Sequence, residues 1–123
     1  MIHLDTSVLV DALTGSKQSA AALRSWLERG ERLALSSLVL YEWRRGPRRP
    51  EELSLQESLF PLGEAVTFGP REAMLAAQLY QSLPRARARA LDFAVAACAL
   101  THEAALWTLN AEDFRDIPGL RLA

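Results

Sequence analysis

The sequence is poor in cysteine and lysine, with one residue of each, and it has no long apolar run. Because Cys98 has no second thiol to pair with, an intrachain disulfide and a cysteine-based zinc cluster are both excluded. No segment approaches the ~18 apolar residues that span a bilayer, and the N-terminus lacks the basic and apolar regions of a signal peptide. We therefore expect a cytoplasmic protein with no membrane partner.

The basic residues are nearly all arginines, and they are concentrated in two segments, "RRGPRRP" (44–50) and "RARAR" (85–89). The net charge of −1 gives no overall attraction to nucleic acid, so such affinity would have to come from local patches. Guanidinium groups suit phosphate binding, although a GC-rich or thermophilic genome would also favour arginine, and solvated arginines often pair with glutamates. The candidate phosphate-binding residues are Arg44, Arg45, Arg48, Arg49, Arg85, Arg87 and Arg89.

Apolar strand patterns alternate with amphipathic helical ones along the chain. With 123 residues, half of them hydrophobic, the sequence is long enough for one domain over residues 1–123 with its own core. Strands that alternate with helices predict an α/β fold with a parallel sheet covered on both faces. The expected strands are 2–4, 31–37, 64–68, 104–110 and 120–123; the expected helices are 6–13, 19–30, 38–45, 51–59, 71–83 and 90–103.

Three carboxylates stand where an apolar interior is expected. Asp5 follows the first strand, Glu42 shares a helix face with Leu38 and Val39, and Asp92 precedes a run of small apolar residues. In a parallel sheet, chemistry gathers at the carboxyl ends of the strands. Each residue also has a structural alternative: Asp5 as a helix cap, Glu42 as the partner of Arg45, and Asp92 as a favourable charge near a helix N-terminus.

A fourth acidic region follows the strand "ALWTL". Asn110 and Asp113 both lie there, and Asn110 is also a candidate helix cap. Mg²⁺ and Mn²⁺ prefer oxygen ligands, and two such ions can stabilise the attacking and leaving oxygens of phosphodiester cleavage. A metal-activated water would then be the nucleophile. That fits this sequence, in which His3 and His102 have no metal-ligand or triad spacing and His3 is expected to pack in or beside the first strand.

These segments together resemble a known family. "LDTSVLVD", "SSLVLYEWRRG", "LDFAVAACAL" and "LWTLNAEDF…IPGLRL" are similar, in order and over nearly the whole chain, to the PIN domain, in particular to VapC-like ribonuclease toxins of type II toxin–antitoxin pairs. The resemblance implies a Rossmann-like α/β/α sandwich with a central parallel sheet of about five strands. It also implies a Mg²⁺- or Mn²⁺-dependent endoribonuclease that forms homodimers and is silenced by a cognate antitoxin.

The resemblance assigns catalytic and metal-binding roles to Asp5, Glu42 and Asp92. One common family pattern has Asp where this chain has Asn110, so we assign the fourth acidic role to Asp113 and a supporting role to Asn110. Supporting hydroxyls are expected from Thr6 and Thr108, for which a helix cap or a strand-end contact is an equal alternative. The two arginine segments flank Glu42 and Asp92, so they could guide an RNA backbone without reading its bases.

Two other functions fit parts of the pattern. A receiver-type phosphoacceptor also clusters acids at a sheet edge, but it needs a lysine late in the chain, and Lys17 lies far too early. A catalytically inactive PIN-like module that binds RNA or protein is disfavoured by the three acids Asp5, Glu42 and Asp92, and is kept open by Asn110.

Overall fold

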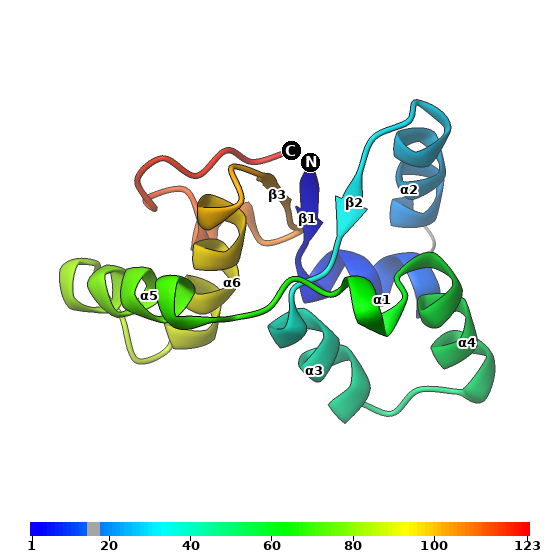
Figure 1. Cartoon of the computed structure of the whole chain (residues 1–123), viewed down its shortest axis with the longest axis horizontal. Helices are drawn as coiled ribbons and strands as arrows, with labels where there is room; N and C mark the ends of the chain where they lie inside the picture. Colours follow the sequence, from blue (N-terminus) through cyan, green and yellow to red (C-terminus); the bar gives the residue numbers. More distant parts are fainter. Residues whose placement is uncertain (15–17) are drawn as a thin grey trace.

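The computed structural model describes residues 1–14 and 18–123, so Lys17 lies outside the described residues. Helices and strands alternate along most of the chain, as the apolar patterns predict (Figure 1). The elements are β1 (Ile2–Leu4), α1 (Thr6–Thr14), α2 (Gln18–Glu28), β2 (Leu33–Ala34), α3 (Ser37–Arg45), α4 (Pro50–Leu59), the 3₁₀ helix η1 (Leu62–Glu64), α5 (Pro70–Ser82), α6 (Ala90–Thr101), β3 (Ala105–Trp107) and the 3₁₀ helix η2 (Ala111–Asp113).

The sheet is parallel, and its first strand lies in the middle. The strand order is β2-β1-β3, with Ile2 opposite both Leu33 and Ala105. Both chain termini lie at the amino end of the strands, whereas β1 and β2 run toward α1 and α3 (Figure 1). The residues that follow the strands therefore meet at one edge, next to the beginnings of these two helices.

Two strands predicted at the edges are reduced to single bridges. Ser36 pairs with Val66 at one edge, and Leu106 pairs with Leu122 at the other. Before Val66 the chain forms η1, in which the Ala65 N–H donates to the Leu62 carbonyl rather than to β2. The expectation of about five strands is thus corrected to three strands flanked by two bridges.

Helices lie on either side of the strands, which confirms the predicted α/β architecture (Figure 1). Helix α6 packs against α5 and β3, while α1 packs against α2, α3 and α4. None of the helices in residues 1–14 and 18–123 is long and apolar enough to cross a membrane.

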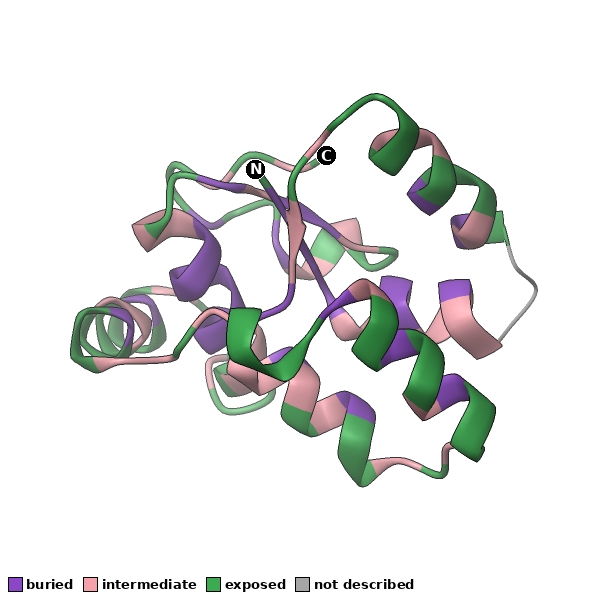
Figure 2. Cartoon of the chain, turned by 45° about the vertical axis from the view of Figure 1, so that its right-hand side comes forward, coloured by how far each residue is buried: buried purple, intermediate pink, exposed green. Residues whose placement is uncertain are grey.

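Helix α6 lies in the middle of the core. Every residue from Phe93 to Ala99 is buried, and most of them are small, which lets the helix approach its neighbours closely (Figure 2). A helix that is apolar on all sides must be surrounded by protein. Asp92 precedes this run, so burial of α6 carries the carboxylate of Asp92 to the edge of the core.

Candidate active site

Asp5 follows β1 directly, and only 6% of its surface is exposed. Its N–H donates to the Trp107 carbonyl at 2.9 Å, which ties Asp5 to the end of β3. The carboxylate oxygen Oδ2 accepts hydrogen bonds from Thr108 Oγ1 at 2.7 Å and from Ser7 Oγ at 3.0 Å. A buried carboxylate is costly unless donors surround it, so these two hydroxyls stabilise its charge.

The backbone of Asp5 also begins α1. Its carbonyl accepts the N–H groups of Val8 and Leu9 at 3.1 and 3.2 Å. The helix-cap alternative therefore describes the backbone of Asp5, while the carboxylate is bound by the hydroxyls of Ser7 and Thr108.

The same hydroxyls hold the loop that follows β3. The Leu109 N–H donates to Ser7 Oγ at 3.1 Å, and the Asn110 N–H donates to Thr108 Oγ1 at 3.0 Å. Thr108 therefore both donates to Asp5 and accepts from Asn110. This arrangement ties the beginning of α1, the end of β1 and the loop after β3 into one polar unit.

Glu42 lies on α3 and faces the beginning of α1. Thr6 Oγ1 donates to Glu42 Oε1 at 2.6 Å, which links Glu42 to the residue after Asp5. The pair with Arg45 is also present, with 3.7 Å between Arg45 Nη2 and Glu42 Oε2. Since Arg45 is largely exposed, this ion pair contributes little to stability, and the hydrogen bond from Thr6 is the tighter contact.

Asp92 lies in the first turn of α6, where the charges of the other acids act on its carboxyl. The pKa of its carboxyl is raised to about 6, first by burial and then by the negative charges of Asp5, Asp113 and Glu42; Arg89 opposes the shift. Neighbouring charges change the pKa of a carboxyl only when they lie close to it. The fold therefore brings the charges of three acids from other segments, Asp5, Asp113 and Glu42, to act on the carboxyl of Asp92.

Asp113 ends η2, and Asn110 precedes that turn. The Asp113 N–H donates to the Asn110 carbonyl at 3.0 Å, and no side-chain cap bond forms from Asn110. Asn110 thus caps the turn through its backbone, and its side chain is exposed. Asp113 is the residue of this loop that acts on the pKa of Asp92.

Arg89 is a structural residue, which corrects its assignment to an exposed RNA-binding rim. It is 3% exposed, and it donates to both carboxylate oxygens of Asp116, to the Asp113 carbonyl at 2.9 Å and to the Pro84 carbonyl at 3.1 Å. Its guanidinium also lies 4.7 Å from the ring centre of Phe93. These contacts fix the loop that carries Asp113 against the beginning of α6.

The other candidate arginines differ in how far their side chains are exposed and in what they contact. Arg48 packs 4.2 Å from the ring centre of Trp43 and donates to the Trp43 carbonyl at 3.0 Å. Because a Cβ on Gly46 would come within 2.8 Å of Arg48 Nη2, glycine at that position makes room for this arrangement. The exposed members are Arg44, paired with Glu57; Arg45, paired with Glu42; Arg49, paired with Glu52; and Arg85 and Arg87.

The acids fit a divalent cation in chemistry but do not form a closed cage. Among the described residues, no group of three or more His, Cys, Asp or Glu side chains is arranged to hold a metal ion. Mg²⁺ does not need such a cage, because it keeps several waters and binds one or two carboxylates together with substrate phosphates. The pKa of Asp92, which is raised first by burial and then by the neighbouring acids, is one that a bound cation would lower.

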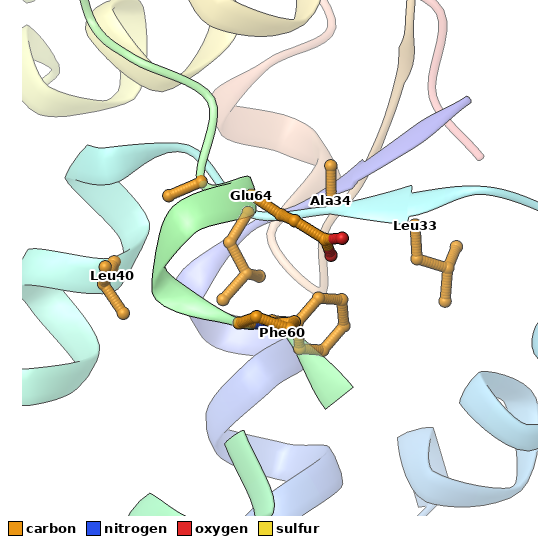
Figure 3. A pocket seen from close by; sticks show the side chains of 8 residues that line it. Leu33, Ala34, Leu40, Phe60 and Glu64 are labelled. Carbon is orange, nitrogen blue, oxygen red and sulfur yellow. The ribbon is translucent and has the colours of Figure 1, made fainter. Parts of the chain in front are cut away.

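Two hollows elsewhere on the molecule are lined by other residues. A cavity of about 20 Å³ lies between β2, α3 and η1, and its size corresponds to roughly one water. Its walls include Leu33, Ala34, Leu40, Phe60 and Glu64 (Figure 3). A wider, mostly apolar groove of about 230 Å³ is formed by α1, α2 and α4, and is lined by Ala12, Leu13, Ala20, Leu23, Arg24, Leu27, Leu55 and Leu59.

Two contributors to the site were not identified from the sequence. Ser7 donates to Asp5, and the signal for it was present in the "DTS" segment, where the serine is two residues beyond the acid. Asp116, which binds Arg89, had no local signal because its partner lies 27 residues away.

Comparison with known proteins identifies a family and a fold. The PIN domain model matches residues 2–120. Ribonuclease VapC19 of Mycobacterium tuberculosis is 31% identical over 121 residues, which cover 96% of this chain and 95% of that protein. The chain superposes on VapBC2 from Rickettsia felis bound to a promoter DNA fragment with a TM-score of 0.79, at 25% identity and over 100% of this chain and 98% of that one. For FitAcB from Neisseria gonorrhoeae the TM-score is 0.74, at 25% identity and over 100% and 97% of the two chains.

Proposed function

This chain belongs to the PIN domain family, and we propose that it is a metal-dependent endoribonuclease that serves as the toxin of a toxin–antitoxin pair. The observation that carries the proposal is the convergence of Asp5, Glu42, Asp92 and Asp113, expressed in the raised pKa of Asp92. A protein gains no stability from acids that repel one another. A ribonuclease relative at 31% identity over almost the whole chain gives this cluster a chemical purpose.

The four acids would hold Mg²⁺ or Mn²⁺. When bound, the cation supplies the positive charge that activates water and stabilises the attacking and leaving oxygens of a phosphodiester. The carboxylates of Asp5, Asp92 and Asp113 and, through α3, that of Glu42 provide hard oxygen ligands of the kind these ions prefer. No histidine, serine or cysteine nucleophile is required.

The other residues of the site fix the acids in position. Thr108 and Ser7 donate to one oxygen of Asp5, and Thr6 donates to one oxygen of Glu42. Arg89 holds the backbone of Asp113 through its carbonyl. Such support keeps ligands oriented before substrate arrives, and its loss commonly costs roughly 10–100-fold in metal affinity or activity.

The exposed arginines would bind the RNA backbone. A phosphate-binding rim supplies affinity without sequence readout, and its members under this proposal are Arg44, Arg45, Arg49, Arg85 and Arg87. Arg48 and Arg89 belong to the structural framework instead, because their guanidinium groups are packed on aromatic rings and bonded to backbone carbonyls.

The proposed protein partner is a cognate antitoxin, and the groove between α1, α2 and α4 is its proposed docking surface. The structural neighbours include VapBC complexes and a toxin–antitoxin complex from Klebsiella pneumoniae. The groove is largely apolar, with Arg24 at its margin, which suits an apolar helix face carrying an acidic residue. A homodimer and a cytoplasmic location remain further parts of the proposal.

The test is cleavage of a labelled pool of structured RNAs by the purified, antitoxin-free protein. We expect cutting in Mn²⁺ or Mg²⁺ and none in chelator. In Asp5→Asn, which changes one ligand and keeps an oxygen for the two hydroxyls, we expect a loss on the order of 100-fold or more. This variant also controls for contaminating nuclease.

The opposite results are equally informative. Cutting that persists in chelator, or that Asp5→Asn leaves unchanged, would contradict a metal-dependent site at these acids. Absence of cutting by folded protein, combined with RNA binding in a gel-shift assay, would favour the inactive PIN-like binding module.

A further inference from the structure

Tyr41 is an exposed aromatic side chain directly beside one of the four acids. It precedes Glu42 on α3 and is 58% exposed. Among the described residues, Tyr80 on α5 is the other exposed aromatic side chain, at 45%. A single exposed tyrosine is common on protein surfaces, so the feature that sets Tyr41 apart is the contact of its ring with Arg45.

Arg45 connects Tyr41 to the acids. Its guanidinium lies 5.2 Å from the ring centre of Tyr41, within cation–π range, and its Nη2 lies 3.7 Å from Glu42 Oε2. Glu42 is in turn bonded to Thr6, next to Asp5. One side chain therefore spans from the tyrosine ring to the acidic cluster.

We propose that the Tyr41 ring, which contacts Arg45 and through it Glu42, is a stacking platform for an unpaired RNA base. This inference rests on the proposed ribonuclease function and adds a specificity residue to it. Stacking on an aromatic ring requires a base that is splayed out of a helix, because paired bases have both faces covered. Tyr41 thus acts on substrate choice, whereas the acids act on the phosphodiester.

A nucleic-acid base fits this platform better than a protein side chain does. Each base has a π-face that a tyrosine can accept, and the adjoining Arg45 is available to the negatively charged backbone. The ring and the cation lie about one turn apart on α3, at i and i+4, a spacing at which two side chains of a helix can contact each other.

The probes are a fluorescein-labelled RNA hairpin with an unpaired loop and the same RNA annealed to its full complement. Affinity is measured by fluorescence anisotropy in chelator, so that no cutting occurs, and cleavage is measured separately in Mn²⁺. We expect Tyr41→Ala to weaken binding and slow cutting of the hairpin by about 5–100-fold, the range for one stacked base. Duplex binding should change by less than about 2-fold, since phosphate contacts supply it.

Two companion variants make the result specific. Tyr41→Phe keeps the ring and should retain the affinity of the wild type, because stacking does not need the hydroxyl. Tyr80→Ala removes the other exposed tyrosine, which lies on α5, and should change neither binding nor cutting. Since Tyr41 is largely exposed, Tyr41→Ala should fold normally, which circular dichroism checks.

Three results would overturn the inference. In the first, Tyr41→Ala binds the hairpin as tightly as the wild type does. In the second, it loses affinity for the hairpin and the duplex equally. In the third, it keeps RNA binding and shifts the oligomeric state, which would identify a protein contact instead. If the wild type cuts neither probe nor the wider RNA pool, the proposed function itself fails. Cutting that is normal in the wild type and unchanged in Tyr41→Ala removes the stacking platform alone.

Discussion

His3 and Asp5 are separated by one residue, and both are nearly inaccessible to solvent, yet their surroundings are opposite. Asp5 accepts hydrogen bonds from two hydroxyls. Both ring nitrogens of His3 are buried without a hydrogen-bond partner in the described part of the chain. The pKa of His3 is lowered to about 4, first by burial and then by His102 and the N-terminal amino group.

The comparison shows what distinguishes a prepared site from a buried polar residue. The ring of His3 lies against that of His102, with 5.7 Å between centroids, and must remain neutral to stay there. Asp5 is surrounded by donors that stabilise its charge. Burial is common to both positions, so the hydrogen-bond partners, rather than burial, distinguish the carboxylate of Asp5 from the ring of His3.

The largest effect should come from protonating His3, whose ring nitrogens have no hydrogen-bond partner in the described part of the chain. The unfolded chain protonates His3 near pH 6.5, whereas the folded chain resists protonation until about pH 4. Between these values the unfolded state binds the extra proton, so the part of the pH profile that is due to His3 should fall with decreasing pH, by roughly 3 kcal/mol in total. Protonation of Asp92, whose pKa is raised, opposes this fall in the wild type, so the His3 part is the difference between the profiles of the wild type and of His3→Leu. Urea unfolding at a series of pH values measures this fall.

His3→Leu should flatten that part of the profile, because leucine cannot take up the proton. His102→Gln serves as the control and should retain most of the fall, since burial is the first cause of the lowered pKa of His3. Equal losses of stability in the wild type and His3→Leu from pH 6.5 to 4 would show that His3 accepts a proton without penalty.

The second effect comes from removing the charge of Asp92, which burial disfavours first and the neighbouring acids next. The pKa of Asp92 is raised, so its charge costs the folded state free energy at pH 7. We expect Asp92→Asn to stabilise the metal-free protein by on the order of 1–2 kcal/mol at pH 7, with a difference that vanishes below about pH 4. Chemical unfolding of both proteins in chelator measures it.

Addition of Mn²⁺ should affect the wild type and Asp92→Asn differently. The ion should raise the Tm of the wild type and raise that of Asp92→Asn much less, because a ligand that binds only the folded state stabilises it. An Asp92→Asn protein that is less stable than the wild type in chelator would mean that the carboxylate is a structural contact rather than one of a repelling group.

The sequence carried enough information to select most residues of this candidate site. A carboxylate on an otherwise apolar face is costly, which identified Asp5, Glu42 and Asp92 without knowledge of their neighbours. The three strands and six helices also followed from apolar spacing. Their meeting at one edge is a consequence of parallel strands, whose carboxyl ends all point the same way.

The failures have two physical causes, a distant partner in one case and a competing local turn in the other. Arg85, Arg87 and Arg89 alternate with alanine and look alike in sequence, yet Arg89 alone meets Asp116 and is buried. The segment 64–68 has a strand-like composition, but the preceding 3₁₀ turn satisfies its backbone locally and leaves one bridge.

The smallest effect should come from removing one donor from Asp5. Thr108→Val keeps the shape of the side chain but deletes the hydroxyl that donates to Asp5 Oδ2 at 2.7 Å, while Ser7 still donates. We expect a loss of about 1 kcal/mol in the free energy of unfolding and roughly 10-fold in cleavage.

The matched control is Thr101→Val, which deletes a 2.6 Å hydroxyl–carboxylate bond to Glu72 at the far end of α6. That variant should lose similar stability and keep full cleavage, because Glu72 is not one of the four acids. Equal cleavage by the two variants would mean that the hydroxyl of Thr108 stabilises the fold without orienting Asp5 for chemistry, and would reduce the contrast between Asp5 and His3 to one of stability alone.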